Sequence, residues 1–358
     1  MRIKKALFLG TLCTAVSGMS LFAQAGVSYA KSAEKTTEAA SSEEAESEEE
    51  TSEEVTYPIT IEHAFGETVI ESKPERIATI GWENQDTPLA LGVAPVGVST
   101  ANYGMVTDNN LHPWTDEAFA DLGVEKPVVF DDVDGLDFEQ ISDCNPDVIL
   151  AAYSGMTQED YDTLSEIAPV IPYKEKAWNT SWREQTIENA EGMGMKPEGE
   201  KKVKEVEDLI AEKLEEYPQL EGIPTAFCWI SADDFSTFYV YLPTDPRAAY
   251  LLDLGFTLPE SVQKLAGETD DFNITVSREN ADQLDDIQLM VVYGDEDLLK
   301  SLQEDKLMSQ IPAIKNGAVA LVDSTSALAG ASTPSILSIP YEIDEYLQLL
   351  SDAAENIK

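Results

Sequence analysis

The sequence predicts an α/β fold made of two doubly wound lobes that are joined by a single long helix. Three observations lead to this prediction. Short apolar segments alternate with helical segments, first in one half of the chain and then in the other, which is typical of a sheet covered on both faces. Residues 197–218 have the apolar spacing of one long helix. A similar unit occurs in both halves, which indicates a duplicated lobe.

The 358 residues are enough for two domains of ordinary size. A basic start followed by an apolar run to about residue 25 predicts a signal peptide over residues 1–30, and hence export from the cytoplasm. Small-residue cleavage sites end at Ala25 and Ala30, and Cys13 follows a poor lipobox. Cleavage near Ala25 or Ala30, a lipid on Cys13 and an uncleaved N-terminal helix therefore stay open as modes of release or attachment.

Residues 31–56 consist mainly of Ser, Thr, Ala and Glu and contain no aromatic residue. Such a segment cannot bury enough apolar surface to fold, so we predict a disordered acidic tether. The net charge of -45 argues against nucleic acid and against docking of the folded part on an anionic membrane. Cys144 and Cys228 fall in different halves, which argues against a disulfide and a cysteine metal site.

Residues 57–196 are expected to form the first lobe. Two short strands, 57–61 and 68–70, flank a turn at Gly66. Further strands are expected at 76–80, 95–98, 128–130, 147–152 and 170–172, with a helical stretch between the first two. Strand, helix and strand in alternation favour a parallel sheet.

The linker helix follows over residues 197–218. Pro197 suits a first helical position, and Pro218 prevents the helix from continuing. Apolar residues recur at three- and four-residue steps and form one stripe: Val203, Val206, Ile210, Leu214 and Tyr217. A helix of this length is roughly 30 Å long, so it can cross a molecule with two lobes.

Residues 219–358 are expected to form the second lobe, with strands at 225–230, 238–242, 288–293 and 318–322 and helices at 246–254 and 340–357. The repeated unit links the halves. Glu139 and Glu279 each open a short helix, an apolar strand follows, and a tyrosine stands at the same spacing after each Glu, at Tyr153 and Tyr293.

Aromatic residues gather where the predicted strands end. Ligands of doubly wound sheets lie beyond the carboxyl ends of the strands, so two facing lobes would share a cleft there. Any one of these rings fits a core position equally well, but the set favours a ligand pocket. The predicted pocket residues are Trp82, Tyr103, Tyr153, Trp178, Trp182, Trp229, Tyr239 and Tyr293.

Arg183 and Arg247 complete the predicted ligand-binding set. Arginine is rare in this chain, and each of the two stands beside aromatic residues. A guanidinium group can bind carboxylate, catecholate or hydroxamate oxygens and can stack on rings. Pairing with a neighbouring acid, such as Glu184 or Asp245, explains either arginine equally well.

No catalytic arrangement stands out. The chain lacks a Gly-x-Ser-x-Gly elbow, a phosphate loop and a His-Glu-x-x-His motif. His63 and His112 are its only histidines, which leaves little material for a triad or a histidine metal site. A pair of catalytic carboxylates can be neither located nor dismissed in so acidic a chain. We therefore expect no catalytic residues, no bound metal and no cofactor.

Several segments resemble the iron-siderophore substrate-binding proteins of ABC importers, the helical-backbone class of solute-binding proteins. The resemblance runs from about Tyr57 to the C-terminus. It is carried by KPERIATIGWENQDTPLALGVAPVGV (73–98), LSEIAPVIPY (164–173), TSWREQT (180–186), FYVYLPTDPRAAYLLDLGF (238–256) and IPAIKNGAVALVD (311–323). The usual Gram-positive form of the family carries a lipobox, which this chain lacks.

The resemblance implies two lobes bridged by one rigid helix, with modest closure around the ligand. It also implies that an acidic residue on each lobe docks on the membrane permease, and the matching positions are Glu139 and Glu279. Trp182, Arg183 and Arg247 match positions where relatives place cleft residues. The expected protein is a monomer at the surface of a bacterial cell or secreted from it.

The resulting expectation is a non-enzymatic extracytoplasmic protein that binds a ferric siderophore and delivers it to an ABC permease. Iron would stay coordinated by the siderophore. Haem or cobalamin on the same fold is one alternative, because haem recruits a His or Tyr axial ligand. A surface hydrolase acting on an acidic or glycan substrate is the alternative from another class.

Overall fold

The computed structural model describes residues 55–132 and 134–358. The predicted signal peptide, with Cys13, Ala25 and Ala30, lies outside these residues, as does the predicted tether except for residues 55 and 56. In the part of the chain that the structure describes, no helix has the length and apolar character needed to cross a membrane.

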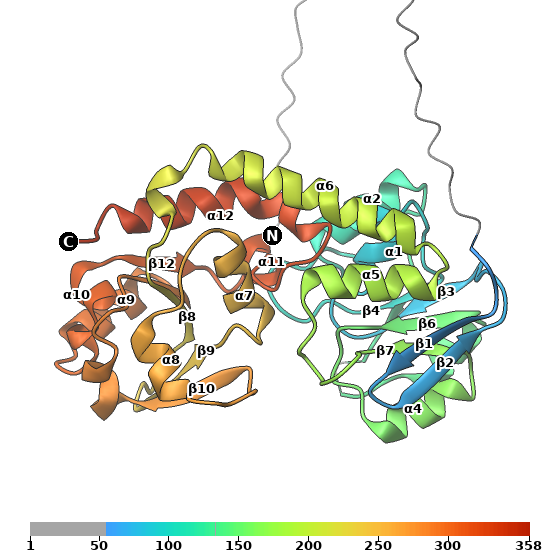
Figure 1. Ribbon diagram of the computed structural model, residues 1–358, viewed down its shortest axis with the longest axis horizontal. Coiled ribbons are helices and arrows are strands. Elements are labelled where there is room, and N and C mark those ends of the chain that lie inside the picture. The colour runs from blue at the N-terminus through green and yellow to red at the C-terminus, as the bar shows by residue number, and fades with distance from the viewer. Residues whose placement is uncertain (1–54, 133) are drawn as a thin grey trace, which may run out of the picture. The chain divides into compact units, whose positions relative to one another are not determined.

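Five parallel strands form the sheet of the first lobe, in the order β5-β4-β3-β6-β7 (Figure 1). The strands are β3 (Ile77–Thr79), β4 (Gly97–Ser99), β5 (Val129–Phe130), β6 (Val148–Ala151) and β7 (Val170–Pro172). An antiparallel hairpin of β1 (Ile59–His63) and β2 (Gly66–Ile70) stands beside this sheet. The helices of the lobe are α1 (Asp86–Ala90), α2 (Pro113–Asp121), α3 (Phe138–Asp143), α4 (Gln158–Ser165) and α5 (Trp182–Gly192).

The second lobe has a mixed sheet in the order β10-β9-β8-β11-β12. Its strands are β8 (Thr225–Trp229), β9 (Thr237–Tyr241), β10 (Asn273–Ser277), β11 (Leu289–Tyr293) and β12 (Val319–Val322). β9 runs antiparallel to both neighbours. For β8 the reason is the short loop 230–236, which leaves no room for the crossover that a parallel neighbour needs. The prediction of an α/β fold with two lobes is confirmed, although strand β10 was not predicted.

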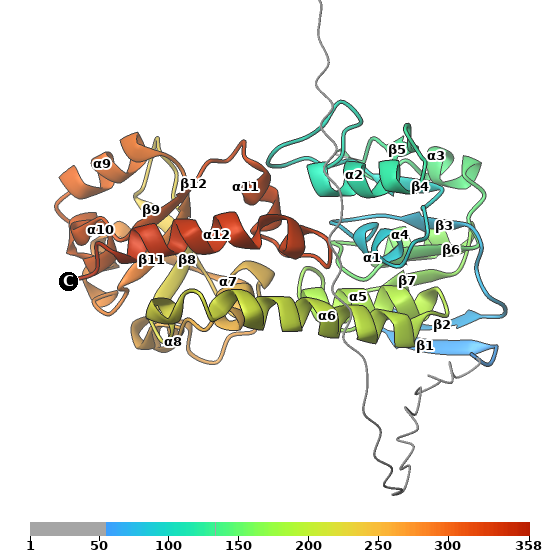
Figure 2. The same ribbon diagram turned by 90° about the horizontal axis from the view of Figure 1, so that it is seen from above.

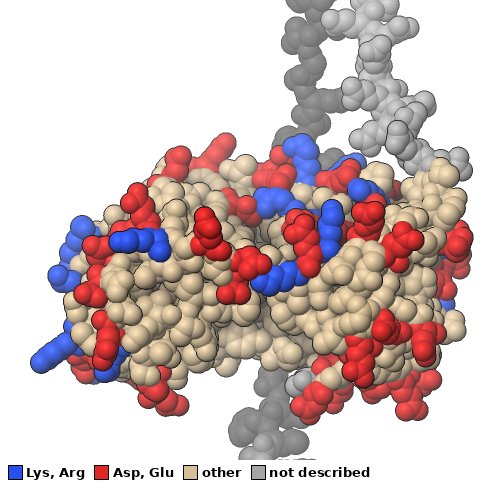
Figure 3. Space-filling view, turned by 60° about the horizontal axis from the view of Figure 1, so that its bottom comes forward, with Lys and Arg blue, Asp and Glu red and all other residues tan. Residues whose placement is uncertain are grey.

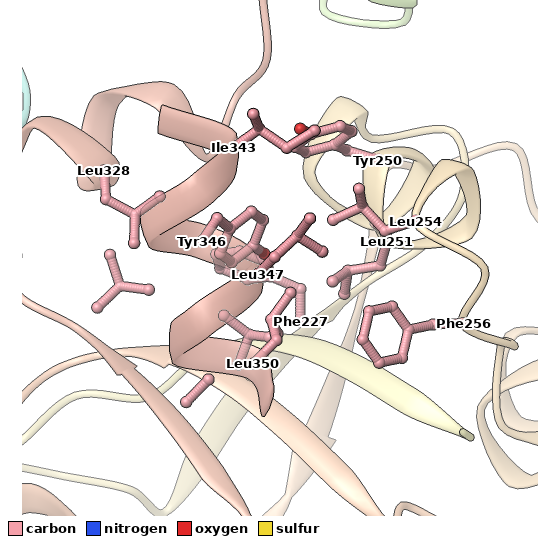
Figure 4. Packing of buried hydrophobic residues seen from close by; sticks show 14 of the residues in the cluster. Phe227, Tyr250, Leu251, Leu254, Phe256, Leu328, Ile343, Tyr346, Leu347 and Leu350 are labelled. Atoms are coloured by element: carbon pink, nitrogen blue, oxygen red, sulfur yellow. The ribbon is translucent and has the colours of Figure 1, made fainter. Parts of the chain in front are cut away.

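Helices cover the second sheet on both faces. They are α7 (Pro246–Asp253), α8 (Glu260–Ala266), α9 (Glu296–Glu304), α10 (Pro312–Asn316), α11 (Ala327–Ala331) and α12 (Ser338–Ala354), with the short 3-10 turns η1 (Pro218–Leu220), η2 (Arg278–Gln283) and η3 (Met308–Gln310). Figure 4 shows how α12 closes one core. Its Ile343, Tyr346, Leu347 and Leu350 pack with Phe227 of β8 and with apolar residues of α7.

The long helix α6 (Lys196–Leu214) runs alongside both lobes (Figures 1 and 2). It begins one residue before Pro197 and ends at Leu214, short of the predicted end at residue 218, where the 3-10 turn η1 begins instead. The stripe of Val203, Val206 and Ile210 is buried, and α6 packs on α5 of the first lobe and on α12 of the second. The spacing of the apolar residues in the sequence thus identifies the face of α6 that packs on both lobes.

Gly199 allows α6 to lie close to α5. A Cβ atom at this position would stand 2.5 Å from the Cβ of Ala190 in α5, which is shorter than a van der Waals contact. The two backbones can approach this closely only because position 199 has no side chain.

We expect Gly199→Ala to lower the free energy of unfolding by about 1–3 kcal/mol, because the new methyl group overpacks the α5–α6 contact. Helix propensity alone would change stability in the opposite direction. Urea unfolding followed by circular dichroism measures the change, with Glu200→Ala on the exposed face of the same turn as the matched control. A more stable Gly199→Ala variant would show that the helices can move apart freely.

Asp86 makes a second joint between the lobes. Its carboxyl group is buried at the start of α1 and accepts hydrogen bonds from Trp114 Nε1 (2.8 Å) and Thr115 Oγ1 (2.8 Å) of α2. It also accepts one from Ser335 Oγ in the segment between α11 and α12 of the second lobe. Burial raises the pKa of Asp86 to about 6, although these three hydrogen bonds act in the opposite direction.

The pKa of Asp86 predicts how stability depends on pH. The folded protein holds the Asp86 proton up to about pH 6, whereas an unfolded chain releases it near 3.8. Stability should therefore fall as pH rises between these two values, by roughly 3 kcal/mol at most. We expect Asp86→Asn to remove this component, so that the stability difference between wild type and variant changes with pH in urea titrations at pH 4 to 7. Asp121→Asn, at the exposed end of α2, is the control. A difference that stays constant over this range would contradict the prediction.

Candidate functional site

The chain order reverses next to the central strand of each sheet, between β3 and β6 in the first lobe and between β8 and β11 in the second. Crevices form at such switch points, beyond the carboxyl ends of the strands. Trp82 and Tyr153 follow β3 and β6, while Trp229 and Tyr293 end β8 and β11. The topology thus brings four aromatic residues to the equivalent place in the two lobes.

A cavity of about 410 Å³ lies between these strand ends, and residues of both lobes line it. The lining residues are Trp82, Tyr103, Tyr153, Trp178, Trp229, Tyr241, Asp245, Arg247, Phe272, Tyr293 and Thr333. Seven of the ten predicted ligand-binding residues are among them. Aromatic rings make up most of the wall, with a single acid and a single base.

The first-lobe wall is held by backbone hydrogen bonds. Asn84 binds Tyr153 on both sides, because its Nδ2 donates to the Tyr153 carbonyl (2.9 Å) and its Oδ1 accepts from the Tyr153 amide (3.1 Å). The Trp82 amide donates to the same carbonyl (3.1 Å), and Gln185 Nε2 of α5 donates to the Trp82 carbonyl (2.8 Å). These hydrogen bonds fix the backbone of Trp82 and Tyr153, and the rings of both residues line the cavity.

Trp178 closes one side of the first-lobe wall. Its backbone has φ 60°, in the left-handed region that a tryptophan rarely adopts. Its amide donates to the Ser154 carbonyl (3.1 Å), and its ring meets the edge of Tyr153 with centroids 5.2 Å apart. Gly155 makes room for the indole, since a Cβ there would stand 2.6 Å from Trp178 Nε1. The strained backbone holds an indole, 41 % exposed, over the cavity.

The second-lobe wall carries the charged pair. Asp245, buried at the N-cap of α7, binds the Arg247 guanidinium through both oxygens, at 2.8 Å to Nε and 2.7 Å to Nη2. The guanidinium also lies over the Tyr241 ring, 4.0 Å from its centroid. Burial by itself would lower the pKa of Arg247, but Asp245 raises it well above the usual value. Arg247 therefore stays charged, and Asp245 balances that charge.

Two further ring contacts border the cavity. Tyr103 of the first lobe meets Tyr293 of the second edge-on, with centroids 5.3 Å apart, so the lobes touch at this point. Tyr239 does not line the cavity itself. It stacks on the lining residue Trp229, its partner on the neighbouring strand, with centroids 5.5 Å apart.

The placement of Trp182 and Arg183 in the cleft is corrected by the structure. Trp182 is buried in the core at the start of α5 and donates from Nε1 to Asp253 Oδ2 (3.1 Å). Arg183 binds Glu207 of α6 (2.6 Å) and Asp253 of α7 (2.7 Å). These acids draw the guanidinium to the joint between α5, α6 and α7, away from the cavity.

Tyr241 belongs to the aromatic residues that the sequence places around the strand ends, and it lines the cavity, but the prediction missed Asp245, Phe272 and Thr333 as lining residues. Asp245 stands two residues before Arg247, where the sequence indicated only a possible ion pair. Phe272 directly precedes β10, the strand that was not predicted. Thr333 follows α11 with no pattern in the sequence that distinguishes it.

The side chains at this site are poorly suited to coordinating a metal ion. Among the described residues, no group of three or more His, Cys, Asp and Glu side chains is arranged to hold a metal ion. Burial raises the pKa of Tyr153, Tyr241 and Tyr293, which disfavours the phenolate form that binds iron. His112 is buried against Trp114 and does not line the cavity. Cys144 and Cys228 are free and buried.

Glu139 and Glu279 occupy equivalent places in the two lobes. Each is exposed in the first turn of a short helical element, α3 and η2 respectively, and each element leads into a strand beside the central one. The repeat seen in the sequence thus corresponds to a repeat in three dimensions.

A sequence profile of the periplasmic binding protein family matches residues 77–325. The chain belongs to this family. The resemblance noted in the sequence is therefore confirmed, and the two lobes with one connecting helix are the expected architecture of its helical-backbone class.

The family includes similar proteins of known structure or name. The crystal structure of PiaA from Streptococcus pneumoniae TIGR4 in complex with ferrichrome is 47% identical, covers 84% of this chain and 100% of its own, and gives a TM-score of 0.81. The petrobactin-binding protein YclQ of Bacillus subtilis (strain 168) is 24% identical over 305 residues, which are 81% of this chain and 88% of YclQ. The probable siderophore-binding lipoprotein YfiY of the same organism is 25% identical over 237 residues, 65% of this chain and 67% of YfiY.

Stability measurements can test the charged pair. We expect Arg247→Gln to cost about 3 kcal/mol of unfolding free energy, because it leaves the buried Asp245 carboxylate without its partner. The double variant Asp245→Asn/Arg247→Gln should recover much of this loss, since it removes both charges. Urea unfolding of the two variants and the wild type measures the difference. Equal losses in the single and double variants would show that the unpaired Asp245 carboxylate is not what destabilises Arg247→Gln.

Proposed function

We propose that this protein captures a ferric siderophore in the cavity between its lobes and delivers it to an ABC permease outside the cytoplasm. One observation carries the proposal: an aromatic cavity built from equivalent strand ends of two lobes, in a family member 47% identical to PiaA, which was crystallised with ferrichrome. The proposed contact residues are Trp82, Tyr103, Tyr153, Trp178, Trp229, Arg247 and Tyr293, with Tyr239 behind Trp229.

The charges of the cavity favour a neutral chelate. Asp245 already balances Arg247, and the two are the only charged residues among the described lining residues. The chain as a whole carries a net charge of -45, and Asp and Glu side chains lie on both lobes in Figure 3, interspersed with Lys and Arg. A ferric tris-hydroxamate is neutral overall, whereas a ferric tris-catecholate carries three negative charges and would be repelled. Hydroxamate siderophores are therefore the proposed substrate class.

Arg247 can orient such a chelate without binding a net charge. Asp245 engages its Nε and Nη2, and a guanidinium has five N–H donors in all. The donors that Asp245 does not use can bind hydroxamate oxygens, while the aromatic walls contact the apolar rim of the chelate. Iron stays coordinated by the siderophore in this proposal, so the protein supplies no metal ligand, no cofactor and no catalytic residue.

Delivery would use the two exposed acids. We propose that Glu139 and Glu279, one on each lobe, dock on basic residues of the permease subunits. Their equivalent positions support a symmetric contact with two related permease subunits. The predicted signal peptide and the lipoprotein name of YfiY support a position at the cell surface.

A titration of tryptophan fluorescence tests the proposed function, because three indoles line the cavity. We expect quenching by ferrichrome, weaker or no binding of a ferric tris-catecholate, and no specific binding of haem or cobalamin. Trp229→Ala should weaken ferrichrome binding at least tenfold, which is about 1.4 kcal/mol.

The matched control is Tyr341→Ala, an exposed aromatic residue that does not line the cavity. A folded protein that binds none of the ferric chelates would refute the transport proposal. Tight haem binding with a Soret shift would instead assign the cavity to haem. Multiple turnovers of a glycan or ester substrate, lost on replacing one carboxylate, would identify the hydrolase alternative.

A further inference from the structure

A second hollow adjoins the cavity inside the first lobe. It has a volume of about 290 Å³ and lies at the carboxyl ends of β3, β4, β5 and β6. Trp82 and Trp178 line both the hollow and the cavity, so a ligand in the cavity lies beside it. We call this hollow the polar chamber, because its walls differ in chemistry from the aromatic cavity.

Apolar residues such as Ile80, Leu136 and Met156 form part of the wall of the polar chamber. Its hydrogen-bonding side chains are those of Ser99, Thr100, Asn102, Asp132, Ser154 and Asp160. Among the described residues that line it, two are acidic and none is basic. The chamber therefore offers oxygen acceptors and negative charge, and a guest group that fits it must donate hydrogen bonds.

The position of Asp132 is built into the sheet. Ser99, 5 % exposed at the end of β4, donates from Oγ to Asp132 Oδ2 and accepts a hydrogen bond from the Gly81 amide (3.0 Å). Gly81 is required there, because its φ is 81° and a Cβ would stand 2.7 Å from the Tyr153 carbonyl oxygen. The same backbone turn thus positions Trp82 for the cavity and Ser99 with Asp132 for the chamber.

We propose that the polar chamber binds a primary ammonium group on a side arm of the chelate, with Asp132 as its main partner. The inference rests on the proposed function, since it assumes that the iron centre occupies the adjoining cavity. An ammonium group has three N–H donors, and the Asp132 carboxylate, Asp160 Oδ1 and the side-chain oxygen of Asn102 offer acceptors for them. The other carboxylate oxygen of Asp160, Oδ2, already accepts hydrogen bonds from the amide and hydroxyl of Thr157 at the start of α4.

The proposal follows from a comparison of the chemical groups that a side arm of the chelate could place in the chamber. A carboxylate arm would meet two acids with no base to balance it, and an apolar arm would displace water from the Asp132 and Asp160 carboxylates without offering them a donor. A hydroxyl arm can donate only one hydrogen bond. An ammonium group gains charge-assisted hydrogen bonds and also balances Asp132, whose pKa burial raises.

The test compares ferrioxamine B, a ferric tris-hydroxamate with a terminal ammonium group, with its N-acetyl derivative, which has the same iron centre without the charge. Calorimetric titration of the full chain should show about tenfold tighter binding of the ammonium form. Asp132→Asn should remove this preference. Ser99→Ala should weaken the preference in the same way, because it frees Asp132.

Asp131→Asn, at an exposed neighbouring position outside the chamber, is the matched control and should keep the preference. Equal binding of both forms by the wild type would overturn the inference and leave the proposed function standing. Binding of ferrichrome but of neither ferrioxamine would overturn it as well. A folded protein that binds no ferric chelate would refute the proposed function itself.

Discussion

The hydrogen bonds to the buried carboxyl group of Asp86 are the constraint on which the arrangement of this molecule depends. They join α1, α2 and the second lobe at a single side chain, through Trp114, Thr115 and Ser335. The segment that leads into α1 carries Trp82 and Asn84, and Asn84 in turn fixes Tyr153. The first-lobe wall of the cavity is therefore positioned by the same group that attaches the lobes to one another. Helix α6 and the Arg183 network provide the second attachment between the lobes.

The cavity combines many aromatic rings with one neutralised charge pair, and this combination determines what it can select. Ring walls contribute contact area and shape, which depend little on the charge of the guest. The buried Asp245–Arg247 pair adds direction, since the guanidinium is held in one plane by two hydrogen bonds and by the Tyr241 ring. In the proposed function, the lack of net positive charge among the described lining residues would select between chelates of different charge.

The sequence predicted the parts of the structure that depend on local pattern. Apolar runs gave most strands, and the equivalent positions of Tyr153 and Tyr293 followed from a repeat readable in the chain. The direction of Arg183 could not be predicted, because its partners Glu207 and Asp253 come close only when α5, α6 and α7 pack together. Asp245, by contrast, stands two residues from Arg247, and their pairing was one of two readings that the sequence left open. Phe272 and Thr333 enter the wall through tertiary packing alone.

The aromatic residues that line the cavity differ in their exposure to solvent. Tyr153, Tyr241 and Tyr293 are less than one-tenth exposed, whereas Trp178, Trp229 and Phe272 are each about two-fifths exposed. These exposed rings form an apolar surface at the cavity, and such surfaces promote self-association. The chain as a whole carries a net charge of -45, so neighbouring copies repel one another over the distance of a Debye length. The strong negative charge therefore opposes association of copies of this protein through their exposed aromatic rings.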